Sequence, residues 1–369
     1  MTNEIQFKQE ALYGILEADI LSGKYEEGAQ LPKEVEFSKT LGVARGTLRN
    51  ALNTLENKGL IVRLRSRGTF VKPRCAKNDI KKILILLDMS QKDDITCPSN
   101  YIIPGIESVA KNGAKTEIWP LQFLNEMDLD SGIKFLNNSF ADGAVIFGGC
   151  YSGKENYIRM LQEFRKPVVM ANSYPGDTAV TGFASVRTES RGAWNAGIKY
   201  LKSKGHQRIA TITYPLMRGY ESLDTYREFL ESEGIYHPGF IKIAQNNYES
   251  IKTAFQSLMG MEHTPTAIMC YSDFYAIHLL KAAREYGIKI PENLAVMGYC
   301  GFPGSAYLDP PLSTVDYHYF KIGETVMEML KKADEWFNVK HVSPPDILYP
   351  YEVIERTSTQ TSRIEGAFL

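Results

Sequence analysis

Residues 31–71 read LPKEVEFSKTLGVARGTLRNALNTLENKGLIVRLRSRGTFV, and this stretch decides the fold of the amino-terminal part of the chain. Pro32 suits the first turn of a helix, because the N–H that proline lacks would have no partner there. Gly42 then permits a tight turn into a second helix, predicted over about 44–58, where three leucines recur at helical spacing. These are Leu48, Leu52 and Leu55. The stretch therefore predicts a helix-turn-helix.

The segments on either side of these two helices complete a small domain. Upstream, apolar residues at helical spacing predict another helix that ends near Gly23. They are Leu12, Ile15, Leu16 and Ile20. Downstream, two β-prone segments at 60–64 and 69–72 are joined by a turn in which Gly68 permits a positive φ. The sequence predicts that this hairpin is a wing whose arginines reach DNA phosphates or the minor groove, namely Arg63, Arg65 and Arg67.

Charge is distributed unevenly along the chain, although the net charge is only −1. Residues 1–77 carry a net charge of +4, which leaves −5 for the remainder. Within 45–74, eight lysines and arginines accompany a single acid, Glu56. Such an excess on a small segment indicates either a polyanionic partner or an ordinary solvated basic face, and charge by itself leaves both open.

Three motifs in this segment resemble the GntR-type repressors. They are LPKE at 31–34, VARGTLR at 43–49 and GTFV at 68–71, in the order and spacing of that family. Two positions depart from its pattern, because Val35 and Ala44 stand where the family usually has an arginine and a serine. Each departure removes a possible DNA contact. The resemblance nevertheless implies a winged-helix head that binds an operator.

The same resemblance implies which residues contact DNA. Two arginines one helical turn apart, Arg45 and Arg49, are expected to meet base edges and phosphates. The alternative for both is a surface ion pair. With the wing arginines included, the predicted DNA-binding residues are Lys33, Arg45, Thr47, Arg49, Arg63, Arg65, Arg67 and Gly68.

Composition and length predict two or three packed units. The 369 residues are 44% hydrophobic and 23% charged, which is typical of globular proteins. Residues 73–79 are polar, contain proline and lack periodicity, so they are predicted to link a head at 1–72 to a domain at 80–369. No signal peptide and no apolar run of about 20 residues is found, so a cytoplasmic location is expected. The five cysteines are scattered, so neither disulfides nor a metal site are predicted.

Beyond the linker, short apolar runs alternate with amphipathic helices. The runs lie at 83–87, 144–147, 168–171, 209–213, 267–271 and 294–297. This alternation predicts doubly wound parallel sheets, and about 290 residues suffice for two lobes. The predicted class is therefore α/β, with an N-terminal winged helix-turn-helix and a two-lobed doubly wound domain. Ligands of such folds bind at the carboxyl ends of the strands, in the cleft.

Several motifs of this region resemble the sensor domain of LacI/GalR-type repressors, which is related to periplasmic binding proteins. They are DGAVI at 142–146, PVV at 167–169, GHQRIA at 205–210, PTAI at 265–268, SD at 272–273, VMGY at 296–299 and PPLSTV at 310–315. A GntR-type head on such a sensor is similar to the arabinose-responsive repressors. The resemblance implies a dimeric repressor of carbohydrate-utilisation genes, controlled by a sugar or sugar derivative.

The cleft is where the sequence departs from the family pattern. Ser272 replaces an asparagine, Cys300 and Gly301 replace paired aspartates, and Tyr317 replaces a glutamine. The candidate effector-binding residues are Asn172, Arg218, Ser272, Asp273, Cys300 and Tyr317. Because few acceptors remain, the effector is expected to be less polar than a free sugar, or to be a sugar held by different residues. The alternative is that the alignment is offset by a residue or two in the loops.

Aromatic residues at or just beyond the predicted strand ends could stack on a ligand, although each alone is more often a core residue. They are Tyr214, Tyr271, Tyr299, Tyr317 and Phe320. No nucleophile elbow, P-loop or zinc-protease motif is present, so no enzyme activity and no cofactor are predicted. Two rival functions are a solute-binding receptor and a pyridoxal-phosphate enzyme fused to the same head, and neither accounts for both halves of the chain.

Overall fold

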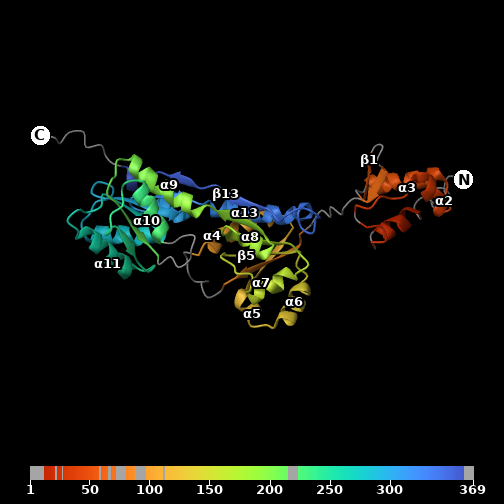
Figure 1. Cartoon of the computed structure of the whole chain (residues 1–369), viewed down its shortest axis with the longest axis horizontal. Helices are drawn as coiled ribbons and strands as arrows, with labels where there is room; N and C mark the ends of the chain where they lie inside the picture. Colours follow the sequence, from red (N-terminus) through yellow and green to blue (C-terminus); the bar gives the residue numbers. More distant parts are fainter. Residues whose placement is uncertain are drawn as a thin grey trace. The chain divides into compact units, whose positions relative to one another are not determined.

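Two compact units make up the chain (Figure 1). One comprises Met1–Asp79 and Lys331–Val342, and the other comprises Ile80–Leu330 and Ser343–Leu369. The computed structural model describes residues 12–20, 23–26, 28–57, 60–64, 68–71, 80–88, 97–110, 113–214 and 223–360. The predicted linker at 73–79 lies outside these ranges, so the proposed domain limits of 1–72 and 80–369 remain predictions.

The amino-terminal head is a winged helix-turn-helix, as predicted. Residues 12–20 are helical, and α2 (Glu34–Thr40) and α3 (Arg45–Asn57) form the helix-turn-helix. Strands β1 (Ile61–Leu64) and β2 (Gly68–Val71) pair antiparallel, and Gln30 forms an isolated bridge to Phe70.

The helices of the head enclose a hydrophobic core that the leucine spacing predicted. Leu48, Leu52 and Leu55 of α3 are buried, and Ile61 and Val71 of the hairpin pack into the same cluster. Among the spaced apolar residues of the upstream helix, Ile15 has a side chain that is 56% exposed. The upstream helix turns its apolar face to the core through the buried residues Leu12, Leu16 and Ile20.

The first lobe of the larger unit is built on a six-stranded parallel sheet. Its strand order is β13-β7-β6-β5-β3-β4. The strands are β3 (Lys82–Leu87), β4 (Lys115–Pro120), β5 (Gly143–Phe147), β6 (Val168–Ser173), β7 (Ala184–Thr188) and β13 (Asp346–Tyr349). Its helices are α4 (Ser99–Ala110), α5 (Leu121–Asn125), α6 (Leu129–Asn137), α7 (Asn156–Gln162), α8 (Asp177–Thr181) and α13 (Tyr319–Lys331). Three of these strands were missed, because β4 and β13 are partly exposed and polar residues interrupt the apolar run of β7.

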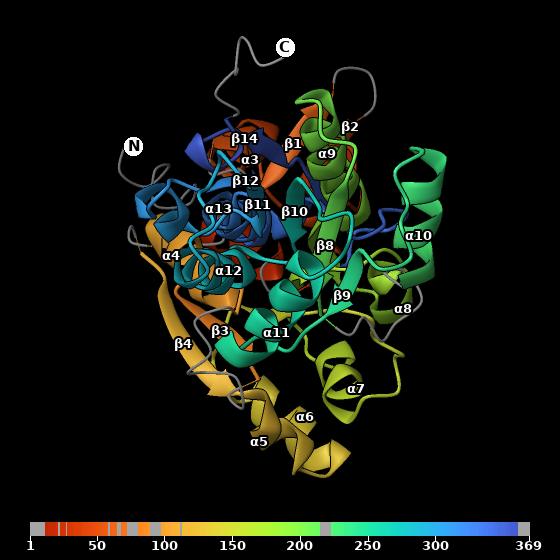
Figure 2. The ribbon, with the colours of Figure 1, turned by 90° about the vertical axis from the view of Figure 1, so that its left-hand side faces the viewer.

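The second lobe has a six-stranded sheet of order β14-β12-β11-β10-β8-β9, in which only β14 runs antiparallel to its neighbour. Its strands are β8 (Ile209–Thr213), β9 (Ile241–Ile243), β10 (Ala267–Cys270), β11 (Ala295–Cys300), β12 (Ser313–Asp316) and β14 (Glu352–Ile354). Its helices are α9 (Ser190–Ser203), α10 (Leu223–Ser232), α11 (Tyr248–Met259) and α12 (Asp273–Glu285). Figure 2 shows α9 on one side of this sheet and α11 and α12 on the other. The fold is therefore the doubly wound α/β arrangement that the apolar runs predicted.

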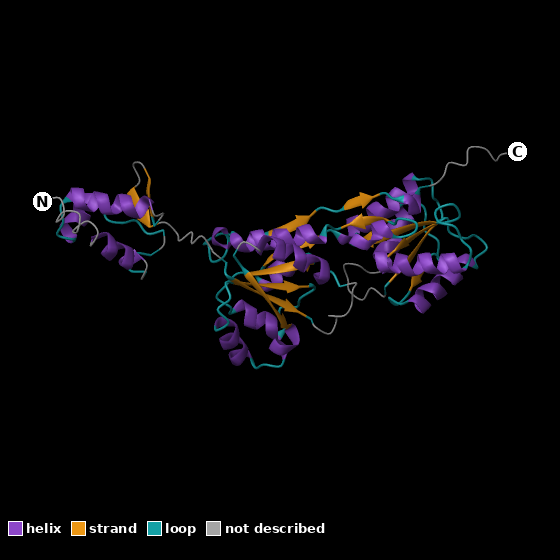
Figure 3. Ribbon diagram, turned by 180° about the vertical axis from the view of Figure 1, so that it is seen from behind, coloured by secondary structure: helices purple, strands orange, loops and turns teal. Residues whose placement is uncertain are grey.

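The chain passes between the two lobes three times. It leaves the first sheet after β7, returns after β12, and passes again from β13 to β14. The two groups of strands are seen separately in Figure 3. Because most strands within each sheet are parallel, their carboxyl ends share one edge, and that edge positions the loops described below.

Candidate DNA-binding surface and effector cavity

Helix α3 presents a polar face to solvent opposite its buried leucines. The exposed residues are Arg45, Gly46, Arg49, Asn50, Asn53 and Thr54. The first turn of α3 contains no acid, so its N–H groups and positive dipole end favour an anion there. A polyanion is therefore the ligand that suits this face.

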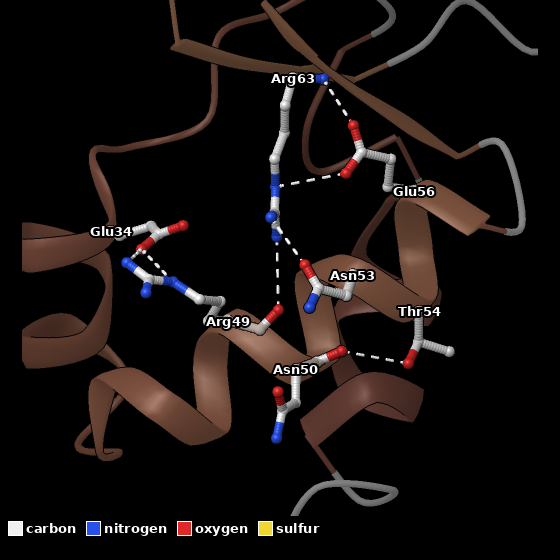
Figure 4. Close-up of polar contacts among 7 residues, drawn as sticks. All are labelled: Glu34, Arg49, Asn50, Asn53, Thr54, Glu56 and Arg63. Carbon is white, nitrogen blue, oxygen red and sulfur yellow. Dashed lines mark hydrogen bonds and ion pairs between the residues drawn. The ribbon is translucent and has the colours of Figure 1, made fainter. Parts of the chain in front are cut away.

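Arg49 is held by an acid from the preceding helix. Its Nε and Nη2 donate to Oε2 of Glu34, the first residue of α2, at 3.2 and 2.9 Å (Figure 4). The Arg49 side chain is 58% exposed, so the pair contributes less than about 1 kcal/mol to stability. Its guanidinium is therefore able to exchange the carboxylate for a phosphate or a base edge at small cost.

Arg63 does not project from the wing as the sequence suggested. Its Nη1 donates to Asn53 Oδ1 at 2.7 Å, and its Nη2 donates to the Arg49 carbonyl oxygen at 3.3 Å. Its backbone N–H donates to Glu56 Oε1 at 3.1 Å, and Nε lies 3.7 Å from Glu56 Oε2. Residues 61 and 63 share one face of β1, and because Ile61 enters the core, that face points toward α3. Arg63 is thereby tied to α3 at the surface of the head, and its contact with DNA stays a prediction.

The other predicted DNA-binding residues lie at the edges of the same surface. Lys33 is exposed directly before α2, Arg45 is exposed at the start of α3, and Thr47 is half-buried. Gly68 has a φ of 120°, a conformation that residues with a side chain rarely adopt, so glycine suits this end of β2. Arg65 and Arg67 lie outside the described residues.

The second site is a cavity of about 380 Å³ in the larger unit. It is lined by Cys97, Pro98, Asn172, Ser173, Tyr174, Thr188, Ser190, Tyr214, Asn246, Tyr271, Ser272, Tyr275, Tyr299, Cys300, Phe302, Tyr317 and Tyr319. Most of them come from the strand ends and following loops of both sheets. No aspartate, glutamate, lysine or arginine is among the described residues that line it. The described wall of the cavity is therefore aromatic, hydroxyl and amide in character.

The tyrosines of the cavity form a continuous series of ring contacts. The centroids of Tyr214 and Tyr271 are 6.2 Å apart, and those of Tyr271 and Tyr299 are 6.4 Å apart. Tyr317 lies 5.1 Å from Tyr299, and its hydroxyl donates to the Tyr299 hydroxyl, which donates in turn to the Ser190 carbonyl oxygen. Burial raises the pKa of Tyr317 well above its ordinary value, so this hydroxyl stays protonated. Four of the five aromatic residues predicted from the strand ends line the cavity.

The fifth predicted aromatic residue, Phe320, is 44% exposed and does not line this cavity. Several lining residues were not predicted. Tyr174 directly follows β6, and Phe302 lies two residues after the end of β11. Position after a strand was therefore a usable signal for both residues. Tyr275 lies inside α12, where the sequence gives no such signal.

Two of the predicted effector residues hold unusual backbone conformations at strand ends. Asn172 lies at an irregularity of the β6–β7 pairing with a φ of 56°, and Cys300 ends β11 with a φ of 91°. Positive φ values are uncommon for residues other than glycine and occur often at binding sites. Ser272 also lines the cavity, and its Oγ caps α12 by accepting from the Tyr275 N–H. The structure thus brings Asn172, Ser272, Cys300 and Tyr317 to one cavity.

Asp273 is not among the lining residues, and this corrects the sequence-based expectation. Its carboxylate is completely buried and accepts hydrogen bonds from the Phe302 N–H at 2.8 Å, from Thr314 Oγ1 at 2.6 Å and from Ser305 Oγ. Burial raises its pKa to about 6, although these hydrogen bonds oppose the shift. The acid therefore fixes the loop after β11 to β12, and its acceptor capacity is used there.

Asp177 performs a similar task in the other lobe, and the sequence had not singled it out. Its carboxylate accepts from the backbone N–H groups of Tyr174, Tyr151 and Cys150 at 2.7, 3.1 and 3.2 Å. Burial raises its pKa, while these hydrogen bonds lower it. Asp177 and Asp273, each close in sequence to a residue that lines the cavity, thus hold loops in place. Arg218 lies outside the described residues and stays a prediction.

Neither a membrane nor a metal site is indicated by the described part of the chain. None of its helices has the length and apolarity needed to cross a bilayer. Within the same ranges, no group of three or more histidine, cysteine and acidic residues is arranged to hold a metal ion.

Two family models match separate parts of the chain. Residues 8–71 match the family of bacterial regulatory proteins, gntR family, and residues 198–359 match the periplasmic binding protein-like domain. The HTH-type transcriptional repressor CytR of Escherichia coli K12 is 28% identical over 291 residues, which cover 77% of this chain and 81% of the relative. The HTH-type transcriptional repressor PurR of Escherichia coli O1:K1 is 30% identical over 220 residues, covering 59% and 63%.

A solved structure shows the same fold as the larger unit. The LacI family transcriptional regulator from Enterococcus faecium, solved with bound ribose, superposes with a TM-score of 0.58 at 22% identity. The match covers 77% of this chain and 100% of that one. The curated relatives are repressors rather than enzymes, which agrees with the absence of catalytic motifs in the sequence.

Proposed function

Because the chain is a DNA-binding transcriptional repressor that joins a GntR-type head to a LacI-type periplasmic-binding-protein-like effector domain, we propose that an uncharged sugar or sugar derivative controls its operator binding. The observation that carries this proposal is the cavity of about 380 Å³, whose described lining is uncharged and rich in tyrosine. A volume of this size suits a small metabolite.

The lining chemistry supports this class of effector. Tyrosine rings pack against the apolar faces of sugars, while the amides of Asn172 and Asn246 and nearby hydroxyls supply donors and acceptors. The solved relative with bound ribose carries a pentose in the same fold. Because the described lining holds no carboxylate, a derivative with an apolar substituent is expected to bind better than a free pentose or hexose. Asn172, Ser272, Cys300 and Tyr317 are the proposed contacts.

The position of the cavity lining also suggests how effector binding changes the DNA affinity of the head. Its lining comes from both sheets, and three chain segments connect the two lobes, so a ligand that contacts both lobes favours one arrangement of them. A ligand shifts an equilibrium by its differential affinity for two states. We therefore expect effector binding to change operator affinity, and the chain to act as a cytoplasmic dimer on paired half-sites.

A gel shift on the DNA upstream of the chain's own gene tests the proposal. The duplex is titrated with the full chain, with and without free sugars, sugar phosphates and aryl or alkyl glycosides, and calorimetry measures the affinity of each compound. A specific shift that a neutral derivative alters supports the proposal. Specific DNA binding that responds only to charged compounds overturns the effector class. No specific DNA binding, together with tight ligand binding, favours a solute-binding receptor.

A further inference from the structure

Two asparagines lie one helical turn apart on the exposed face of α3, and the structure treats them differently. A carboxamide recognises adenine in the major groove through two contacts, in which its N–H₂ donates to N7 and its oxygen accepts from the N6 amino group. Both ends of the amide must therefore be available. Asn50 and Asn53 both lie on the polar face of the helix, so the sequence alone makes each a candidate.

The side-chain oxygen of Asn53 already accepts an internal hydrogen bond, which directs the amide at Arg63. Its Oδ1 accepts from Arg63 Nη1 at 2.7 Å, a short charge-assisted hydrogen bond. The same guanidinium also donates to the Arg49 carbonyl oxygen, and its Nε lies near Glu56 (Figure 4). Because these partners fix the Arg63 side chain from several directions, the acceptor of Asn53 stays occupied.

The side-chain oxygen and N–H₂ group of Asn50 are both available. Its backbone carbonyl accepts from Thr54 Oγ1 at 3.1 Å, and among the described residues its side-chain amide makes no hydrogen bond. Helical side chains lean toward the helix amino terminus, so the Asn50 amide lies over the turn that contains Gly46. A Cβ at Gly46 would meet nothing within 4 Å. The surface beside Asn50 is therefore open to a base.

We propose that Asn50 is a specificity-determining residue that recognises an adenine in the operator, and that Arg63 is a positioning residue that ties wing strand β1 to α3 and withholds Asn53 from the DNA. The proposal rests on the DNA-binding function of the head.

Selection from a randomised DNA library tests the assignment of Asn50. The full-length chain and its Asn50→Ala variant each select duplexes, and the affinity of every selected sequence is measured at one salt concentration. We expect the wild type to prefer adenine at one position of each half-site and the variant to lose that preference only. The loss amounts to about 5- to 150-fold in discrimination. A variant that selects the wild-type sequences unchanged overturns the proposal, whereas a wild type that selects no sequence contradicts the DNA-binding function itself.

A second measurement needs no variant and so does not depend on how Asn50→Ala folds. The selected adenine is replaced by 7-deazaadenine, which lacks the N7 acceptor but keeps the Watson–Crick edge. We expect wild-type affinity to fall at least about 5-fold, because one of the two amide contacts is lost. Equal affinity for the two duplexes would exclude the amide contact. The same replacement at an adenine outside the half-sites is the control.

The role of Arg63 is tested through base preference, which a merely structural residue would not alter. Arg63→Ala releases the Asn53 amide, so the selected sequences should gain a preference at a second position. The double variant Arg63→Ala/Asn53→Ala should lack that gain, and Arg63→Lys, which still donates to Asn53, should restore the wild-type pattern. If Arg63→Ala weakens binding equally for all sequences and adds no preference, the positioning role is wrong.

Discussion

The exposed face of α3 and the cavity of the effector domain differ in charge. On α3, cations are exposed, and the Glu34–Arg49 pair is held loosely enough to exchange partners. Around the cavity, the described lining is uncharged, and Asp273, next in sequence to the lining residue Ser272, is buried in a hydrogen-bonded network. The difference suits the DNA that the head binds and the neutral effector that we propose: a polyanion is attracted by exposed positive charge, whereas a neutral metabolite is held by shape, ring contacts and hydroxyl groups.

The comparison also separates two uses of a charged side chain. In this chain the exposed charge of Arg49 adds little to folding and is accessible to a partner, whereas the buried carboxyl of Asp273 holds loops of the fold. Mutations of the two kinds should therefore change different measurements.

The largest expected effect is on stability, at Asp273. Asp273→Ala leaves the Phe302 N–H and the hydroxyls of Ser305 and Thr314 without their acceptor in a buried site. We expect the free energy of unfolding to fall by about 3 kcal/mol, because each unsatisfied buried donor costs roughly 1 to 3 kcal/mol. Urea denaturation measures this loss. The exposed acid Glu292 provides the control, since Glu292→Ala should change stability by less than about 0.5 kcal/mol. Equal losses of stability in the two variants would contradict the structural role assigned to the buried Asp273.

The pH dependence of stability is the next largest effect. The pKa of Asp273 is about 6 in the folded protein against 3.8 ordinarily, so between these values the folded state holds a proton that the unfolded state has released. The contribution of this group to stability therefore rises as pH falls through that window, by roughly 2 to 3 kcal/mol in total. The difference in unfolding free energy between wild type and Asp273→Asn should be larger at pH 4.5 than at pH 7.5. A difference that does not change with pH contradicts the burial of an ionisable carboxyl.

On the α3 side, the largest effect should appear in DNA binding rather than stability. Arg49→Ala should weaken specific operator binding by about 1 to 3 kcal/mol if the guanidinium contacts a base. Arg227→Ala removes the same charge from α10 in the effector domain and serves as the matched control, with little change expected. Fluorescence anisotropy at fixed salt measures both. Operator binding that is unchanged in Arg49→Ala would remove this residue from the interface.

The smallest expected effect is at Glu34. Glu34→Gln removes the carboxylate that Arg49 must leave when it contacts DNA, so operator affinity should stay equal or improve by less than about 1 kcal/mol. Its effect on unfolding should be within the same limit, because the pair is exposed. A large loss of operator affinity would instead mean that Glu34 holds Arg49 in its DNA-bound orientation.

The sequence by itself determined the head and most central strands. Helical spacing of Leu48, Leu52 and Leu55, with Gly42 before them, reports local preferences that neighbouring residues enforce. Apolar runs such as that at β3 likewise predicted buried parallel strands, because both faces of such strands are covered. Strand β13 gave no such signal, because two of its four residues are exposed and it has no continuous apolar run.

What the sequence could not determine is where each polar side chain finds its partner. Arg63 and Asp273 carry the residue types of binding sites, and the tertiary structure assigns both to internal networks. The partners of Asp273 lie 29 to 41 residues away, at Phe302, Ser305 and Thr314. Local pattern fixes secondary structure because its interactions span a few residues, whereas burial and charge pairing depend on segments that only the folded chain brings together.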